Sequence, residues 1–122
     1  MARDLEGLRI LVVEDEYLVA MDVVRAIEHL GGEIVGPVGR LEPARDTVRR
    51  EAFDGAVLDL RLDGTTSLPL AEELLARSVP IILATGYDAS ALPESFGHVP
   101  RLKKPFNDRA LQKIAVETFR RV

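Results

Sequence analysis

Apolar residues along the chain follow two alternating patterns, short and largely apolar runs and stretches with helical spacing. The short runs occupy residues 8–13, 33–38, 55–60, 80–84 and 101–103. Short runs rich in aliphatic side chains are typical of strands that are buried on both faces of a parallel sheet. The chain therefore predicts five strands.

Helical spacing follows the first of these runs. Apolar residues recur there every three or four positions, which places them on one face of a helix. Gly31 and Gly32 then supply a helix stop. The inward positions of this predicted helix are Ala20, Val23, Val24, Ile27 and Leu30.

Proline and short polar residues mark the next two helices. Pro43 opens a predicted helix that runs to about Glu51, because proline is tolerated in a first turn. Ser67 and Pro69 open another, and residues 64–66 before it predict a turn.

The C-terminal part of the chain predicts two further helices. Residues 90–96 favour only a short, weak helix, because proline and glycine interrupt this stretch. Asn107 is a suitable N-cap for a final helix over residues 108–121. We expect Tyr17 and Phe119 to be packing residues.

Strands that alternate with helices predict a parallel sheet with helices on both faces, joined by right-handed crossovers. For five strands we adopt the flavodoxin-like order 2-1-3-4-5 by analogy with known doubly wound folds. The length of 122 residues suits one α/β domain over residues 1–122. In such sheets the ligand site lies beyond the carboxyl ends of the strands.

Chemically active residues stand at the ends of the predicted strands. Glu14 and Asp15 follow the first strand, Asp59 lies near the end of the third, Thr85 follows the fourth, and Lys104 follows the fifth. Because parallel strands end at one edge of the sheet, these three carboxylates, one hydroxyl and one ammonium are expected to meet there.

Three clustered carboxylates need a compensating cation. At about 4 Å each like-charged pair costs on the order of 4 kcal/mol at an effective dielectric of 20. Oxygen ligands without histidine or cysteine favour Mg²⁺, Mn²⁺ or Ca²⁺. Lys104 adds a charge and Thr85 a donor, both suited to a phosphate. An aspartate can also act as a nucleophile towards phosphorus and form an acyl phosphate.

Four segments together resemble the signature regions of response-regulator receiver domains, and the similarity covers essentially the whole chain. They are residues 11–16 (LVVEDE), 57–60 (VLDL), 84–87 (ATGY) and 104–106 (KPF). Each motif alone is weak, but all four in order at the predicted strand ends are specific. Because the four motifs occur together, interpretations of single residues, such as Lys104 as an ordinary solvated lysine, become less convincing.

The resemblance implies a role for each of the acidic-site residues. Asp59 would be the phosphoacceptor. Asp15 would bind Mg²⁺ directly, Glu14 would act through water, and the backbone carbonyl of Arg61 would be a third protein ligand. Mn²⁺ could replace Mg²⁺.

The same resemblance implies that Thr85 and Lys104 bind phosphoryl oxygens and that the Lys104–Pro105 peptide bond is cis. The chain departs from the family at Arg101, where most receivers carry a switch aromatic. Tyr87 is a candidate to replace that ring, and family positions equivalent to Arg61 and Tyr87 tune the lifetime of the phosphoryl group.

Residues 82–87, with Pro100 and Leu102, resemble the "FAT GUY" subgroup of receivers, although Leu83 replaces the usual phenylalanine. Members of that subgroup are often free-standing and work with histidine kinases of the HWE or a related class. The resemblance thus implies phosphoryl transfer from a histidine kinase or phosphotransfer protein. We expect self-phosphorylation and dephosphorylation without other enzymatic activity.

Composition narrows the partners and the location. The net charge of −4 and the pI of about 5.2 argue against nucleic-acid or membrane binding. No secretory or membrane-spanning segment can be drawn, so we expect a cytoplasmic protein. We expect no output domain, so a downstream protein partner would detect the phosphorylated state by docking on a surface such as the last helix. The chain itself would be a monomer or weak dimer.

Two alternatives remain open. A pseudo-receiver would keep the fold and bind a partner without phosphoryl transfer. Residues 62–65 (LDGT) resemble part of the DxDGT motif of haloacid-dehalogenase phosphatases, but Arg61 stands where that motif needs its nucleophilic aspartate. The chain is also short for that fold.

Overall fold

A five-stranded parallel sheet forms the centre of the protein, which we describe from a computed structural model over residues 3–86 and 92–120. The strand order β2-β1-β3-β6-β7 is the flavodoxin-like order predicted from the sequence, once the two strands of a small hairpin are numbered in between. The sheet strands are β1 (Arg9–Val13), β2 (Glu33–Val38), β3 (Gly55–Asp59), β6 (Ile81–Thr85) and β7 (Arg101–Lys103).

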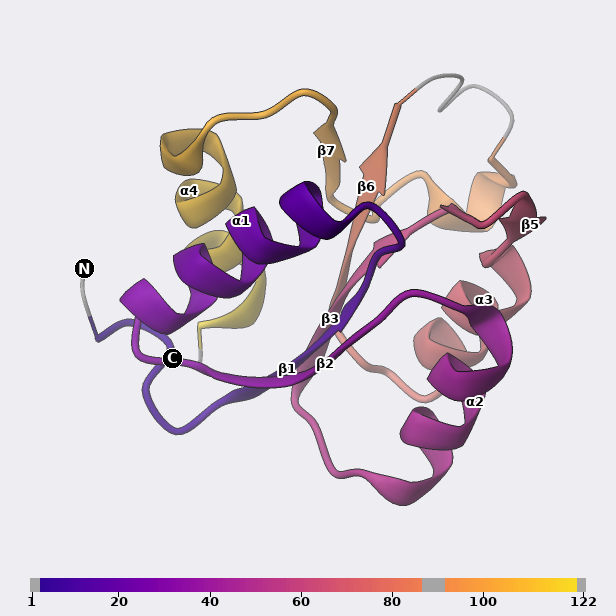
Figure 1. The fold of residues 1–122 in the computed structure, drawn as a ribbon, viewed down its shortest axis with the longest axis horizontal. Coiled ribbons are helices and arrows are strands. Elements are labelled where there is room, and N and C mark those ends of the chain that lie inside the picture. The colour runs from indigo at the N-terminus through magenta and orange to yellow at the C-terminus, as the bar shows by residue number, and fades with distance from the viewer. Residues whose placement is uncertain (1–2, 87–91, 121–122) are drawn as a thin grey trace.

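Within residues 3–86 and 92–120, four α-helices cover the two faces of this sheet. Figure 1 shows α1 and α4 on one side and α2 and α3 on the other. The helices are α1 (Tyr17–His29), α2 (Leu41–Arg50), α3 (Leu68–Ala76) and α4 (Asp108–Phe119). The α/β class and the five strands are therefore confirmed.

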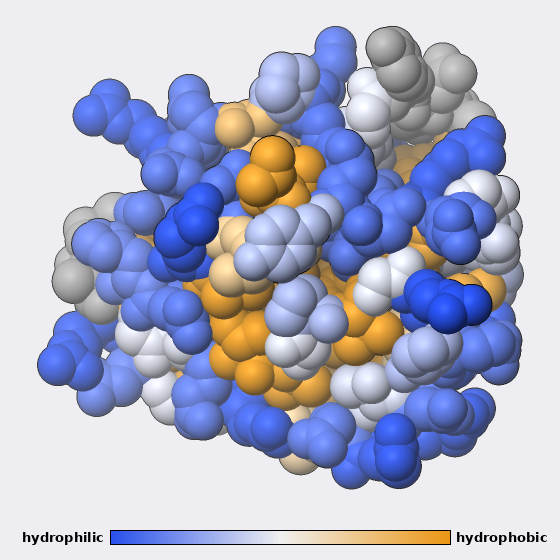
Figure 2. Space-filling model, viewed as in Figure 1, coloured by the Kyte–Doolittle hydropathy of each residue, from blue (hydrophilic) through white to orange (hydrophobic). Residues whose placement is uncertain are grey.

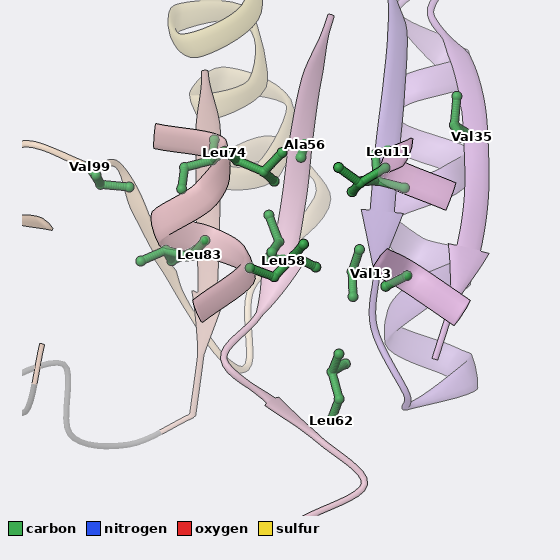
Figure 3. Close-up of a cluster of buried hydrophobic side chains, with 14 of the residues drawn as sticks. Leu11, Val13, Val35, Ala56, Leu58, Leu62, Leu74, Leu83 and Val99 are labelled. Atoms are coloured by element: carbon green, nitrogen blue, oxygen red, sulfur yellow. The ribbon is translucent and has the colours of Figure 1, made fainter. Parts of the chain in front are cut away.

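Successive side chains of each central strand serve two different cores. Ile10 and Val12 of β1 pack in the cluster beneath α1 and α4. Leu11 and Val13 of the same strand pack in the cluster beneath α2 and α3, which Figure 3 shows. Because side chains alternate across a strand, a continuous apolar run fills both cores at once.

Two helix starts show how local sequence determines the boundaries. The Asn107 side chain accepts a hydrogen bond from the backbone N–H of Ala110 at 2.8 Å, which confirms the predicted N-cap of α4. Helix α2 begins at Leu41, two residues before Pro43. Pro43 still lies in the first turn, where backbone N–H groups have no partner within the helix.

Two loop predictions need correction. Of the turn predicted over residues 64–66, only Gly64 lies in a turn, because Thr65–Thr66 form β5, which pairs with β4 (Arg61–Leu62) as a short antiparallel hairpin. Of the helix predicted over residues 90–96, the structure describes only a single 3-10 turn, η2 (Glu94–Phe96), while residues 87–91 lie outside the described part.

Of the two predicted packing aromatics, one is confirmed and one is wrong. Phe119 is buried against the α1 side of the sheet. Tyr17 is 74% exposed and its neighbour Leu18 is 76% exposed, because Val23 and Ile27 occupy the inward face of α1. Apolar side chains also reach the surface in the middle of the face shown in Figure 2, among hydrophilic ones.

Among residues 3–86 and 92–120, no helix combines the length and apolar character that crossing a membrane requires.

Substitution of Gly55 tests the packing between β3 and α4. A Cβ atom there would lie 2.5 Å from Cδ1 of Phe119. We therefore expect Gly55→Ala to lower the free energy of unfolding by about 1–3 kcal/mol in denaturant titrations. Gly86→Ala is the matched control, because no described atom lies within 4 Å of its added Cβ. An equal loss in both variants would contradict the overpacking explanation.

Candidate functional site

The carboxyl ends of four parallel strands define an open pocket of about 760 Å³. Strand β3 ends at Asp59 and β6 ends at Thr85, while Lys104 directly follows β7. Asp15 enters from the segment after β1. All four residues line the pocket, so the topology brings together residues separated by up to 89 positions in the sequence.

The ammonium group of Lys104 is the electrostatic centre of this pocket. Its Nζ lies 2.9 Å from Oε1 of Glu14, 2.9 Å from Oε1 of Glu16 and 3.0 Å from Oδ2 of Asp59. An ammonium carries three N–H donors. Three carboxylates therefore compete for one cation, and each has a contact within hydrogen-bonding distance.

Burial changes the protonation equilibria of two of these groups. Burial raises the pKa of Glu14 to about 7, although its hydrogen bond with Lys104 acts in the opposite direction. Burial alone would lower the pKa of Lys104, but its bonds with Glu14, Glu16 and Asp59 outweigh that effect and raise it above the ordinary value. The lysine therefore remains charged, while Glu14 depends on a nearby cation to stay ionised near neutral pH.

Backbone groups orient the acidic side chains. The N–H of Arg61 donates to Oδ1 of Asp59 at 3.1 Å, and the N–H of Asp63 donates to Oδ2 of Asp15 at 2.8 Å. The β4–β5 hairpin thus holds two carboxylates at once. Its turn contains Asp63 (φ 49°) and Gly64 (φ 79°), and positive φ at the second position suits glycine.

Thr85 and Lys104 are joined through the backbone. The N–H of Lys104 donates to the carbonyl oxygen of Thr85 at 2.7 Å. Thr85 is buried, and the Lys104–Pro105 peptide bond is cis, as the family resemblance implied. The lysine backbone is therefore held against the end of β6 next to the pocket.

The acidic residues present fit a divalent cation with oxygen ligands. Glu14, Asp15, Glu16 and Asp59 each offer a carboxylate oxygen, and these oxygens all lie within 4.8 Å of one another. Mg²⁺ is bound in proteins by one or two carboxylates, with water and phosphate oxygens completing its coordination. Asp15, Glu16 and Asp59 all line the open pocket, so a metal in the pocket can reach their carboxylates.

The remaining predicted site residues differ in whether they line the pocket. Arg61 lines the pocket. Arg101, at the start of β7, is exposed and its guanidinium donates to the carbonyl oxygen of Phe96 at 3.3 Å. Among the described residues it is not part of the pocket lining. Tyr87 lies outside the described residues.

Two polar residues of the site were not anticipated. Glu16 was expected only as part of an acidic run, yet it bonds with Lys104. Ser67 was expected only to open a helix, yet its buried hydroxyl donates to the backbone carbonyl of Asp59. A run of three acids could have suggested the first contact, whereas the second depends on the path of the chain between β3 and α3.

Comparison with known families agrees with this architecture. Residues 10–116 match the model of the response regulator receiver domain. The chain belongs to this family, which is the class of protein that the fold and the acidic pocket also indicate.

Curated relatives carry the same kind of region within longer proteins. The transcriptional regulatory protein PdtaR of Mycobacterium tuberculosis (strain H37Rv) is 28% identical over 121 residues, which cover 93% of this chain and 59% of PdtaR. The phyllosphere-induced regulator PhyR of Methylorubrum extorquens is 34% identical over 106 residues, covering 80% of this chain and 38% of PhyR. The chain thus spans less than two thirds of the length of each relative.

Solved structures of similar length include SdrG from Sphingomonas melonis. Its solution structure has a TM-score of 0.78 and 36% identity, and the match covers 93% of this chain and 96% of SdrG. The BeF₃-activated conformation of SdrG from Pseudomonas melonis Fr1 has a TM-score of 0.71 and 37% identity, and the match covers 89% of this chain and 94% of that one.

Removal of the Lys104 charge tests its role in balancing the buried acids. In metal-free buffer above neutral pH, Lys104→Met should lower the free energy of unfolding by about 3 kcal/mol, because Glu14 and Asp59 would lose their cation. Saturating Mg²⁺ should recover part of this loss. Denaturant unfolding with and without Mg²⁺ measures both effects.

The matched control is Lys113→Met on the exposed side of α4, which should change stability by less than about 0.5 kcal/mol. Equal stabilities of the two variants in metal-free buffer would show that the acids do not depend on Lys104.

Proposed function

We propose that the protein is a phosphoacceptor that receives a phosphoryl group on Asp59 from a phosphohistidine of a partner protein. One observation supports this most strongly. The Asp59 carboxylate lies at the end of β3 with the Lys104 ammonium 3.0 Å away and three further carboxylates within metal-binding distance. Anionic nucleophile, cation and metal ligands are the parts that phosphoryl transfer requires.

The two carboxylate oxygens of Asp59 accept hydrogen bonds from different partners. Oδ1 accepts from the Arg61 N–H, and Oδ2 accepts from Lys104. In the proposed step one carboxylate oxygen forms a bond to phosphorus as the bond from phosphorus to the donor imidazole nitrogen breaks. The imidazole takes up a proton and leaves as a neutral ring.

Charge on the transferred group is balanced by residues already in place. Lys104 would donate to the phosphoryl oxygens, and Thr85, which lines the same pocket, would donate from its hydroxyl as well. Mg²⁺, or Mn²⁺ in its place, would neutralise the remaining negative charge. We assign it to the carboxylates of Asp15 and Asp59 and the Arg61 carbonyl, with Glu14 acting through water.

Hydrolysis of the acyl phosphate would reset the site, so the chain would catalyse only its own phosphorylation and dephosphorylation. Tyr87 and Arg61 are the proposed tuning residues for that step, and Arg101 stands where the family carries its switch aromatic. We place the reaction in the cytoplasm.

The proposed phosphodonor is a sensor histidine kinase, of the HWE or a related class, or a phosphotransfer protein. Residues 82–87 support membership of the FAT GUY subgroup, from which the kinase class follows. Tyr17 and Leu18 offer exposed apolar area at the start of α1, directly after the site residue Glu16, where a donor protein would approach. Helix α4 is the proposed docking surface for a downstream protein.

Labelling with a small phosphodonor tests the central assignment. With acetyl phosphate and Mg²⁺, intact-mass analysis should show one added phosphoryl group on the wild type and none on Asp59→Asn. The control is Asp22→Asn, which removes an exposed carboxylate of α1 that pairs with Arg25, and it should label like the wild type.

Removal of Mg²⁺ with a chelator should abolish labelling. An unlabelled wild type under these conditions, and with a histidine kinase as donor, would instead favour a pseudo-receiver that binds its partner without phosphoryl transfer.

A further inference from the structure

We propose that Glu16 is a positioning residue that holds the Lys104 ammonium while Asp59 is unmodified and releases it when a phosphoryl group arrives. Glu16 would therefore oppose phosphorylation and make the unmodified state more favourable. This role rests on the proposed function of Asp59. It assigns a regulatory task to a side chain outside the expected phosphoacceptor and metal ligands.

Three carboxylates already surround the Lys104 ammonium. Nζ donates to Oε1 of Glu16 at 2.9 Å and to Oδ2 of Asp59 at 3.0 Å, and it lies 2.9 Å from Oε1 of Glu14. An ammonium has three N–H groups, so a phosphoryl oxygen competes with these carboxylates for the same donors. Lys104 gives up one of these contacts when it binds the new group.

Differences in burial show which carboxylate loses its contact with Lys104 at the least cost. The side chain of Glu14 is 3% exposed and that of Asp59 is 9% exposed, whereas that of Glu16 is 61% exposed. A buried carboxylate that loses its cation has no water to replace it, which is costly. The carboxylate of Glu16 can be rehydrated at once, so its bond with Lys104 is the least costly to lose.

The position of Glu16 fits such a release. Its backbone N–H donates to Oε2 of Glu14 at 3.1 Å, so its backbone remains anchored beside the site when its side chain moves. The residue immediately precedes α1. A carboxylate that moves into solvent also removes negative charge from the neighbourhood of an incoming anion.

Binding of beryllofluoride, a phosphoryl analogue that adds to a carboxylate, measures this competition. At saturating Mg²⁺, Glu16→Gln should bind beryllofluoride about two- to fivefold more tightly than the wild type, the gain expected from losing one exposed ion pair. Glu16→Asp keeps the charge but shortens the side chain, so it should also bind more tightly. Asp22→Asn, within α1, should match the wild type.

A double-mutant cycle tests whether Glu16 acts through the lysine. In a Lys104→Met background, Glu16→Gln should produce little further change in beryllofluoride affinity. A gain as large as that in the wild-type background would show that Glu16 acts only through its own charge and would overturn the assignment. So would unchanged or weaker binding by Glu16→Gln in the wild-type background.

The nitrogen resonance of Lys104 Nζ gives a readout that needs neither metal nor phosphoryl donor. In metal-free protein, Glu16→Gln should shift this resonance and speed exchange of its hydrogens with water, because one hydrogen bond is lost. An unchanged resonance would show that Glu16 does not hold the lysine. Wild type that binds no beryllofluoride and takes up no phosphoryl group would overturn the function of Asp59 as well, which distinguishes the two failures.

Discussion

The ion pairing of one ammonium with three carboxylates is the interaction on which the pocket depends. Lys104 contacts Glu14, Glu16 and Asp59 within 3.0 Å, and two of these acids are almost fully buried. Without the lysine or a metal, ionised Glu14 and Asp59 would repel each other with no nearby compensation. The pocket is therefore suited to added positive charge, and burial, together with the nearby charge of Asp59, raises the pKa of Glu14 despite its bond with Lys104.

The fold produces this arrangement by making all sheet strands parallel. Residues that end β3, end β6 and follow β7 necessarily reach the same edge, however far apart they are in sequence. Two cores hold the strands in register, because alternate side chains of each strand pack under α1 and α4 or under α2 and α3. The small β4–β5 hairpin then orients Asp15 and Asp59 through backbone N–H groups. The apolar side chains pack in these two cores, whereas the charged side chains of the pocket lie at the carboxyl edge of the sheet.

Much of this could be predicted because it follows from periodicity and topology. Five apolar runs defined the strands, and the strand ends identified Asp59, Thr85 and Lys104 as neighbours. The contact between Glu16 and Lys104 could not be predicted, because nothing in an acidic run indicates which side chain turns towards a distant lysine. The hairpin was missed because its two strands have two residues each, too few for an alternating pattern. The exposure of Tyr17 could not be predicted either, because helical spacing does not show where along α1 the buried face begins.

A structure of the protein crystallised with Mg²⁺ and beryllofluoride tests the central claim most directly, because it locates the metal, the phosphoryl analogue and the lysine together. We predict a metal bound by Asp15 and Asp59, beryllium bonded to an Asp59 oxygen, and the Lys104 ammonium donating to a fluorine. Beryllofluoride on another carboxylate, or a metal bound away from Asp15 and Asp59, would contradict the account.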